Sequence, residues 1–179
     1  MSALMSAFGL SFFSALAIIR IKQAYLADSW VFTTLSLMLG VQAGIAAVLY
    51  IRRTPAEEEA AWWAQLVAWI SALMPMLMQP ASVGDWRILL PLPGLILALW
   101  AMLALDRSFS VTPAKRKLVS DGPYRYLRHP MYAGESLSLT GILLGNFSCW
   151  NGLVLVLFLL SLLWRIKEEE ALLYNENEE

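Results

Sequence analysis

The stretch WVFTTLSLMLGVQAGIAAVLYI, residues 30–51, determines the class of fold to which this chain belongs. It contains 22 residues and no charged side chain. At a rise of about 1.5 Å per residue, a helix of this length crosses the hydrocarbon core of a bilayer, which is about 30 Å thick. The stretch therefore predicts a transmembrane helix.

Five further apolar segments accompany this one. The six run over residues 3–19, 30–51, 62–78, 88–105, 132–145 and 149–166. The fifth is the shortest, and its 14 residues cover only about 21 Å of the bilayer core. Hydrophobic residues make up 59% of the 179-residue chain, whereas soluble domains contain about 45–50%. We predict an all-α fold, with residues 1–179 forming a single polytopic membrane domain of about six transmembrane helices.

Two local patterns predict how these helices pack. Pro75 lies inside the third segment and predicts a kink, because proline removes a backbone N–H donor. Gly40 with Gly44, and Gly141 with Gly145, form two GxxxG pairs. Such pairs let helix backbones approach closely, either within one chain or across a dimer interface.

The basic residues predict the orientation in the membrane. If the long loop after residue 105 is cytoplasmic, ten of the 13 basic residues lie inside, and only Arg20, Lys22 and Arg87 lie outside. This excess agrees with the positive-inside rule. A net charge of −1 and basic residues confined to the flanks of spans give no reason to expect a nucleic-acid partner. The single cysteine, Cys149, excludes a multi-cysteine metal site, and we expect no metal.

The longest polar stretch, residues 106–134, reads DRSFSVTPAKRKLVSDGPYRYLRHPMYAG. Arg128 and His129, the only histidine, directly precede Pro130. Proline favours the first turn of a helix, so we expect the fifth segment to begin at Pro130 and His129 to lie at a helix N-terminus. Such a terminus favours a bound carboxylate or phosphate. The alternative is a basic cluster that contacts anionic lipid head groups.

A second polar cluster, WRIKEEEALL, follows the sixth segment at residues 164–173. Arg165 and Glu169 are four residues apart and therefore share one helix face. Carboxylates near a helix C-terminus oppose the helix dipole, which suggests a cationic ligand group. The alternative is a solvated helix end in which the glutamates pair with Arg165 and Lys167. Both polar segments are predicted on the same membrane face, so together they suggest a site for a zwitterion.

The motif LVSDGPYRYLRHPMYAG at 118–134, followed by EEALL at 169–173, resembles the isoprenylcysteine carboxyl methyltransferase family, and related phospholipid N-methyltransferases share the glutamate pair. The resemblance implies an S-adenosylmethionine-dependent methyltransferase with its cofactor site in residues 106–134 and 165–173. It implies that these residues bind the cofactor: Leu118, Val119, Gly122, Tyr124, His129, Tyr132, Glu169 and Glu170. It also places Glu169, Glu170 and Arg128 at the catalytic centre, with Glu168 as the alternative register of the pair.

The expected acceptor is lipophilic and enters from the bilayer, and its reactive group is a carboxylate, a thiol or an amine. Membrane lipids are the other expected partners. A compact chain of this kind suggests the inner membrane of a prokaryote, with the active site facing the cytoplasm. Two alternatives stay open: a nicotinamide-dependent membrane reductase and a non-enzymatic membrane component.

Overall fold

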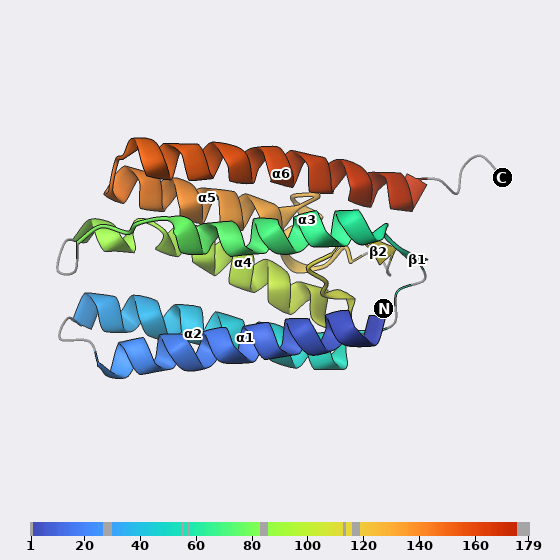
Figure 1. Cartoon of the computed structure of the whole chain (residues 1–179), viewed down its shortest axis with the longest axis horizontal. Helices are drawn as coiled ribbons and strands as arrows, with labels where there is room; N and C mark the ends of the chain where they lie inside the picture. The colour runs from blue at the N-terminus through green and yellow to red at the C-terminus, as the bar shows by residue number, and fades with distance from the viewer. Residues whose placement is uncertain are drawn as a thin grey trace.

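The computed structural model describes residues 2–26, 30–54, 56, 58–82, 86–112, 114–115 and 119–174. The α-helices are α1 (Ser2–Tyr25), α2 (Trp30–Arg52), α3 (Trp62–Leu73), α4 (Leu92–Leu105), α5 (Pro130–Gly145) and α6 (Cys149–Tyr174). Short 3-10 turns are η1 (Met74–Leu77), η2 (Trp86–Leu89), η3 (Asp106–Ser108) and η4 (Gly122–Arg125). Two-residue strands β1 (Glu58–Glu59) and β2 (Ala114–Lys115) pair antiparallel. The α-helices run side by side in one bundle, with both termini at the same end (Figure 1).

The all-α membrane fold predicted from the apolar segments is confirmed. Within the described residues, four stretches are long and apolar enough to cross a bilayer: Ala7–Tyr25, Thr33–Arg52, Trp86–Ser108 and Cys149–Leu172. The stretch Trp62–Leu77 is apolar but shorter, and α5 contains 16 residues. The number of spanning helices is therefore four by length and composition, and the prediction of six is not confirmed.

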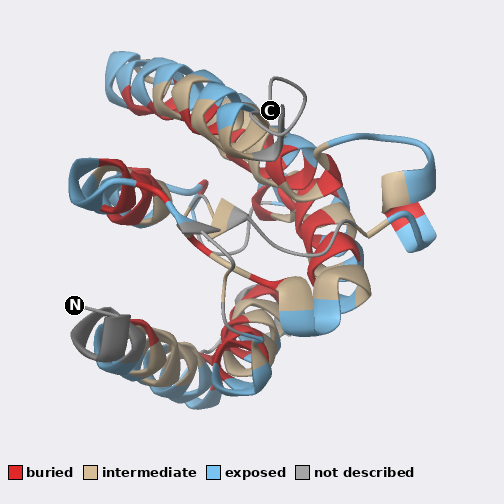
Figure 2. Ribbon diagram, turned by 90° about the vertical axis from the view of Figure 1, so that its right-hand side faces the viewer, coloured by how far each residue is buried: buried red, intermediate tan, exposed pale blue. Residues whose placement is uncertain are grey.

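Helix α6 is apolar on both its inner and its outer faces, as a membrane helix should be. Val154, Phe158 and Leu162 are buried against α5 and the rest of the bundle, whereas Leu153 and Leu160 are exposed on the outside. In Figure 2, seen from the end that carries both termini, buried residues face the interior and exposed residues face outward. The exposed leucines form a surface suited to lipid tails.

The third apolar segment changes geometry at Pro75, as the sequence predicts. Helix α3 ends at Leu73, and the chain continues as the 3-10 turn η1, with Pro75 in its first positions. Because Pro75 has no N–H donor, it cannot continue the α-helical hydrogen-bond ladder. The break shortens α3 relative to its neighbours.

Helices α4 and α5 cross in backbone contact. A Cβ atom added at Gly94 would clash with the Ser138 backbone nitrogen, and one added at Gly134 would lie 2.5 Å from the Ala98 backbone nitrogen. Glycine is therefore required on both sides of the crossing, since no side chain fits between the two backbones. The contact fixes the first turns of α5, which carry the candidate site.

The GxxxG pairs are explained largely by packing within the chain. A Cβ at Gly141 would lie 2.5 Å from the Leu90 carbonyl oxygen, and one at Gly145 would lie 3.0 Å from the Arg87 carbonyl oxygen. A Cβ at Gly40 would meet the Ile21 side chain at 3.2 Å, whereas Gly44 has no neighbour within 4 Å. Gly141 and Gly145 therefore let α5 lie against the segment that leads into α4.

We expect Gly134→Ala to lower the melting temperature in detergent by several degrees, because the methyl group forces two packed backbones apart. Overpacking of this kind typically costs about 1–3 kcal/mol. The matched control is Gly152→Ala in α6, where an added Cβ meets nothing within 4 Å and alanine favours the helix. Equal melting temperatures for the two variants would contradict the close contact.

Polar side chains tie the bundle together at the end opposite the termini. Asn151 is fully buried at the start of α6. Its Nδ2 donates to the Gln79 and Asn146 carbonyl oxygens at 2.8 Å each, and its Oδ1 accepts from the Gln79 backbone N–H at 2.9 Å. Trp150 Nε1 donates to the Leu77 carbonyl oxygen at 2.8 Å. Together these bonds fasten the α5–α6 connection to the segment after α3; we call this set the amide clamp.

Candidate functional site

The polar stretch after α4 is packed against the helices at several points. Phe109, Val111 and Pro123 are buried. Arg165 of α6 donates from Nη2 to the Val111 carbonyl oxygen at 2.8 Å. This bond connects the stretch to α6, 54 residues further along the chain, and so brings the two predicted polar segments together.

Gly122 begins η4 with a φ angle of +58°. This left-handed conformation is costly for residues that carry a Cβ atom. A Cβ there would also lie 3.2 Å from Ala104 Cβ and 3.4 Å from Trp100 Nε1 of α4. Gly122 therefore allows the chain to turn closely over the end of α4 and directs η4 toward α5.

Helix α5 begins at Pro130, as the sequence predicts. His129 is the N-cap residue, with non-helical backbone angles, and its carbonyl oxygen accepts the Ala133 backbone N–H at 3.0 Å. The N–H groups in the first turn of a helix have no partner within the helix. This end of α5 therefore presents free donors, and the His129 ring stands beside them.

The His129 and Tyr132 side chains meet the two glutamates of α6. Tyr132 donates its hydroxyl hydrogen to Glu169 Oε2 at 3.0 Å. His129 Nε2 lies 3.5 Å from Glu170 Oε1, and His129 Nδ1 lies 4.0 Å from Glu169 Oε2. The His129 and Tyr132 rings stack with centroids 5.6 Å apart. These four residues, termed the site cluster, join the N-terminus of α5 to the last turns of α6.

Helix α6 reaches the site cluster because it does not end with its apolar segment. The apolar run stops at residue 166, yet the helix continues to Tyr174. Glu169 and Glu170 therefore lie inside the helix and project over the start of α5. Their side chains keep exposures of 32% and 39%, so both carboxylates remain accessible to a ligand from water.

Arg165 does not pair with the glutamates, so the interpretation of a solvated, paired helix end is wrong for this residue. Its side chain is only 2% exposed and faces inward. Its Cζ lies 4.9 Å from the Tyr132 ring centroid, in cation–π geometry. Arg165 thus packs against the Tyr132 ring and also anchors the loop through its hydrogen bond to Val111.

The other predicted site residues take different positions around the site cluster. Tyr124 is half-buried, and burial, followed by the carboxylates of Glu169 and Glu135, raises the pKa of its phenol. The phenol therefore stays protonated at neutral pH and can donate a hydrogen bond. Val119 is half-buried, and the Arg128 side chain is exposed. Leu118 lies outside the described residues.

The site combines two carboxylates, a histidine, two tyrosines and a free helix N-terminus. The carboxylates suit a cationic group or hydroxyl donors, and the helix N-terminus suits a carboxylate. Val111 and Glu135 also lie at this site and are not among the residues that the sequence predicts. A backbone anchor such as Val111 leaves no mark in the sequence, but a single glutamate inside an apolar helix is itself a signal of function.

Comparison with known protein families matches residues 87–176 to the phospholipid methyltransferase family. No curated protein and no solved structure matches the chain. The matched range begins in η2 and runs through α4, α5 and α6, so it includes every residue of the site cluster. It covers half of the 179 residues, and the chain therefore belongs to the phospholipid methyltransferase family, a family of membrane methyltransferases.

Proposed function

We propose that the chain is an S-adenosylmethionine-dependent methyltransferase of the isoprenylcysteine carboxyl methyltransferase-like type, acting on a lipophilic acceptor at the membrane. The observation that carries the proposal is the contact of His129 and Tyr132 with Glu169 and Glu170. This contact joins the two halves of the sequence motif, which lie about 40 residues apart. A helix end whose glutamates were merely solvated would have no reason to meet the only histidine.

The residues present fit the cofactor. Its ammonium group or ribose hydroxyls would bind the Glu169 and Glu170 carboxylates, which receive only long contacts from His129 and one hydrogen bond from Tyr132. Its carboxylate would bind the free N–H groups at the start of α5. An aromatic ring suits a flat heterocycle, and the half-buried Tyr124 supplies one, whereas Tyr132 would act through its hydrogen bond to Glu169. When bound, this cofactor supplies a methyl group activated by a sulfonium centre.

The protein's own contribution is to hold donor and acceptor in line. Correct orientation can lower a barrier by about 7–11 kcal/mol. A carboxylate acceptor would need no base, whereas a thiol or an amine would lose a proton to Glu169, Glu170 or His129. Glu169, Glu170 and Arg128 would lie at the reacting end of the site. Backbone atoms of Leu118, Val119 and Gly122 would contact the cofactor.

In the proposed orientation, the site cluster and both termini face the cytoplasm, as the charge asymmetry favours. The cofactor would then enter from water, and the acceptor would enter from the bilayer of a prokaryotic inner membrane. Residues 106–134 and 165–173 together form the cofactor site in this proposal.

The test measures S-adenosylhomocysteine binding to the protein in detergent and methyl transfer from a labelled donor to extracted lipids. We expect the parent to bind and to transfer label. His129→Ala should weaken binding by about 1–3 kcal/mol, the cost of losing a hydrogen bond to a charged group. A folded parent that neither binds S-adenosylhomocysteine nor transfers label would overturn the proposed function.

A further inference from the structure

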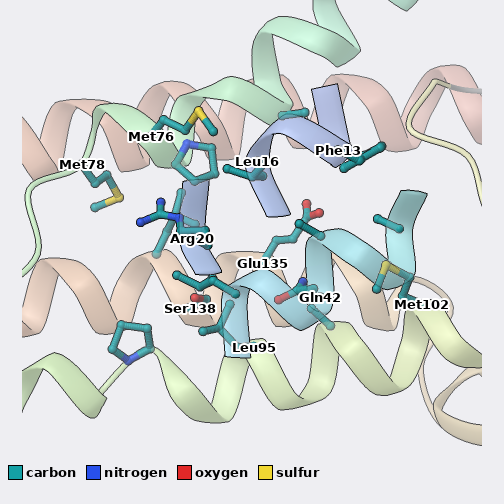
Figure 3. A pocket seen from close by; sticks show the side chains of 18 of the residues that line it. Phe13, Leu16, Arg20, Gln42, Met76, Met78, Leu95, Met102, Glu135 and Ser138 are labelled. Atoms are coloured by element: carbon teal, nitrogen blue, oxygen red, sulfur yellow. The ribbon is translucent and has the colours of Figure 1, made fainter. Parts of the chain in front are cut away.

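A partly open cavity of about 500 Å³ lies beside Arg165 and is lined by residues of all six α-helices. Small-molecule sites usually measure about 300–1,000 Å³. The wall is mostly apolar and includes Phe13, Leu16, Leu95, Met102, Leu139 and Phe158. Figure 3 shows these walls running along the helices, with Arg20 and Met78 toward one end, Phe13 and Met102 toward the other, and Glu135 between them.

The Glu135 carboxyl group projects into the middle of this cavity (Figure 3). None of the hydrogen bonds or ion pairs among the described residues involves it. Gln42 of α2 lines the same space, and its Oε1 is buried without a hydrogen-bond partner. Burying a polar group without a partner typically costs about 1–3 kcal/mol in proteins. Two unsatisfied hydrogen-bond acceptors in one apolar cavity indicate a ligand that donates hydrogen bonds.

The charged groups that line the cavity around Glu135 are Arg165 from α6 and Arg20 from α1. Arg165 already donates to the Val111 carbonyl oxygen and lies over the Tyr132 ring, although its Nε has no partner. Arg20 donates from Nη1 to Gln23 Oε1 at 3.0 Å. Both cations contact other groups, and Arg165 is near enough to act on Glu135 electrostatically, but among the described residues no hydrogen bond or ion pair joins Glu135 to either.

Glu135 is also close to the site cluster along α5. It follows Tyr132 by three residues, and residues three apart share one face of a helix. The Tyr132 ring is in contact with Arg165, which lines the cavity as well. The Tyr132–Arg165 pair therefore lies between the water-accessible glutamates of α6 and the apolar cavity.

We infer that this cavity binds the lipophilic acceptor and that Glu135, assisted by Gln42, holds the polar group of that acceptor through hydrogen bonds that the acceptor donates. That the ligand is a methyl acceptor rests on the proposed function, whereas the existence of the binding site does not. It makes Glu135 the residue that selects a donor head group, such as an amine, over a carboxylate.

The test measures binding of decylamine and decanoate to the detergent-solubilised full chain by native mass spectrometry, without cofactor. We expect the parent to bind decylamine more tightly than decanoate. Glu135→Gln keeps the shape, removes the charge and should weaken decylamine binding at least about tenfold. The control, Glu59→Gln, removes an equal charge from the exposed strand β1 and should bind as the parent does.

A second variant tests the cavity without changing any charge. Ala72 lines the wall, so Ala72→Leu should reduce the occupancy of decylamine. Equal decylamine affinity in the parent and Glu135→Gln would overturn the inference, and so would a preference for decanoate that depends on Arg165. S-adenosylhomocysteine binding, measured in the same samples, reports on the proposed function separately, because Glu135→Gln should leave it within about twofold of the parent value.

Discussion

Replacing Glu169 and Glu170 together by glutamine should weaken S-adenosylhomocysteine binding roughly 100-fold or more. Each substitution preserves the side-chain shape and removes one carboxylate that faces the site. A hydrogen bond to a charged group is worth about 1.5–3 kcal/mol, and each 1.4 kcal/mol corresponds to a tenfold change in affinity. Isothermal titration of parent and variant in the same detergent provides the measurement.

The natural control for this experiment is Glu168→Gln. Glu168 is the neighbouring glutamate on α6, and among the described residues no hydrogen bond or ion pair involves it. Its loss should leave affinity near that of the parent, and it also tests the alternative register of the glutamate pair. The melting temperature without ligand should change little in any of these variants, because the carboxylates are partly exposed. An unchanged affinity in the double variant would show that the glutamates merely end a solvated helix.

Arg165→Met should destabilise the protein and also weaken cofactor binding. The methionine fills similar space but leaves the buried Val111 carbonyl oxygen without a donor, which costs about 1–3 kcal/mol. It also removes the cation behind the Tyr132 ring. We expect a lower melting temperature in detergent and faster proteolysis between residues 112 and 122, because the loop loses its attachment to α6.

Two further variants make this test specific. Arg165→Lys retains the charge but lacks the planar guanidinium group, so it should recover only part of the lost stability. Lys167→Met removes an exposed cation two residues away and should match the parent in both stability and proteolysis. If Arg165→Met and Lys167→Met behaved alike, the Arg165–Val111 bond would have no role in holding the loop.

Much of this architecture follows from one-dimensional patterns. The apolar runs predict the helices because a membrane helix must contain consecutive apolar residues, and His129-Pro130 predicts the start of α5 because proline fits only the first turn of a helix. The short connection at residues 146–148 makes α5 and α6 neighbours, so the meeting of His129 with the glutamates also follows. The helix predicted to carry Arg165 and Glu169 is also present, because lysine, glutamate and alanine at 167–171 are strong helix formers and α6 continues to Tyr174.

Other features need the three-dimensional arrangement. The spacing of Arg165 and Glu169 correctly predicts a shared helix face, but it cannot show that the loop offers a carbonyl oxygen that attracts the arginine inward. Gly94 and Gly134 lie in different helices, and nothing in either helix identifies its partner. The cavity is formed by residues from all six α-helices and η1, so no local pattern reveals it.

The amide clamp gives the bundle unequal ends. Around Asn151, directional hydrogen bonds fix the helices at one end, and breaking them would leave buried amides without partners. At the other end, α6 meets α5 through the buried Arg165–Tyr132 contact and through the partly exposed Glu169 and Glu170. The bundle thus has uncharged amide hydrogen bonds at one end and the charged side chains of the site cluster at the other.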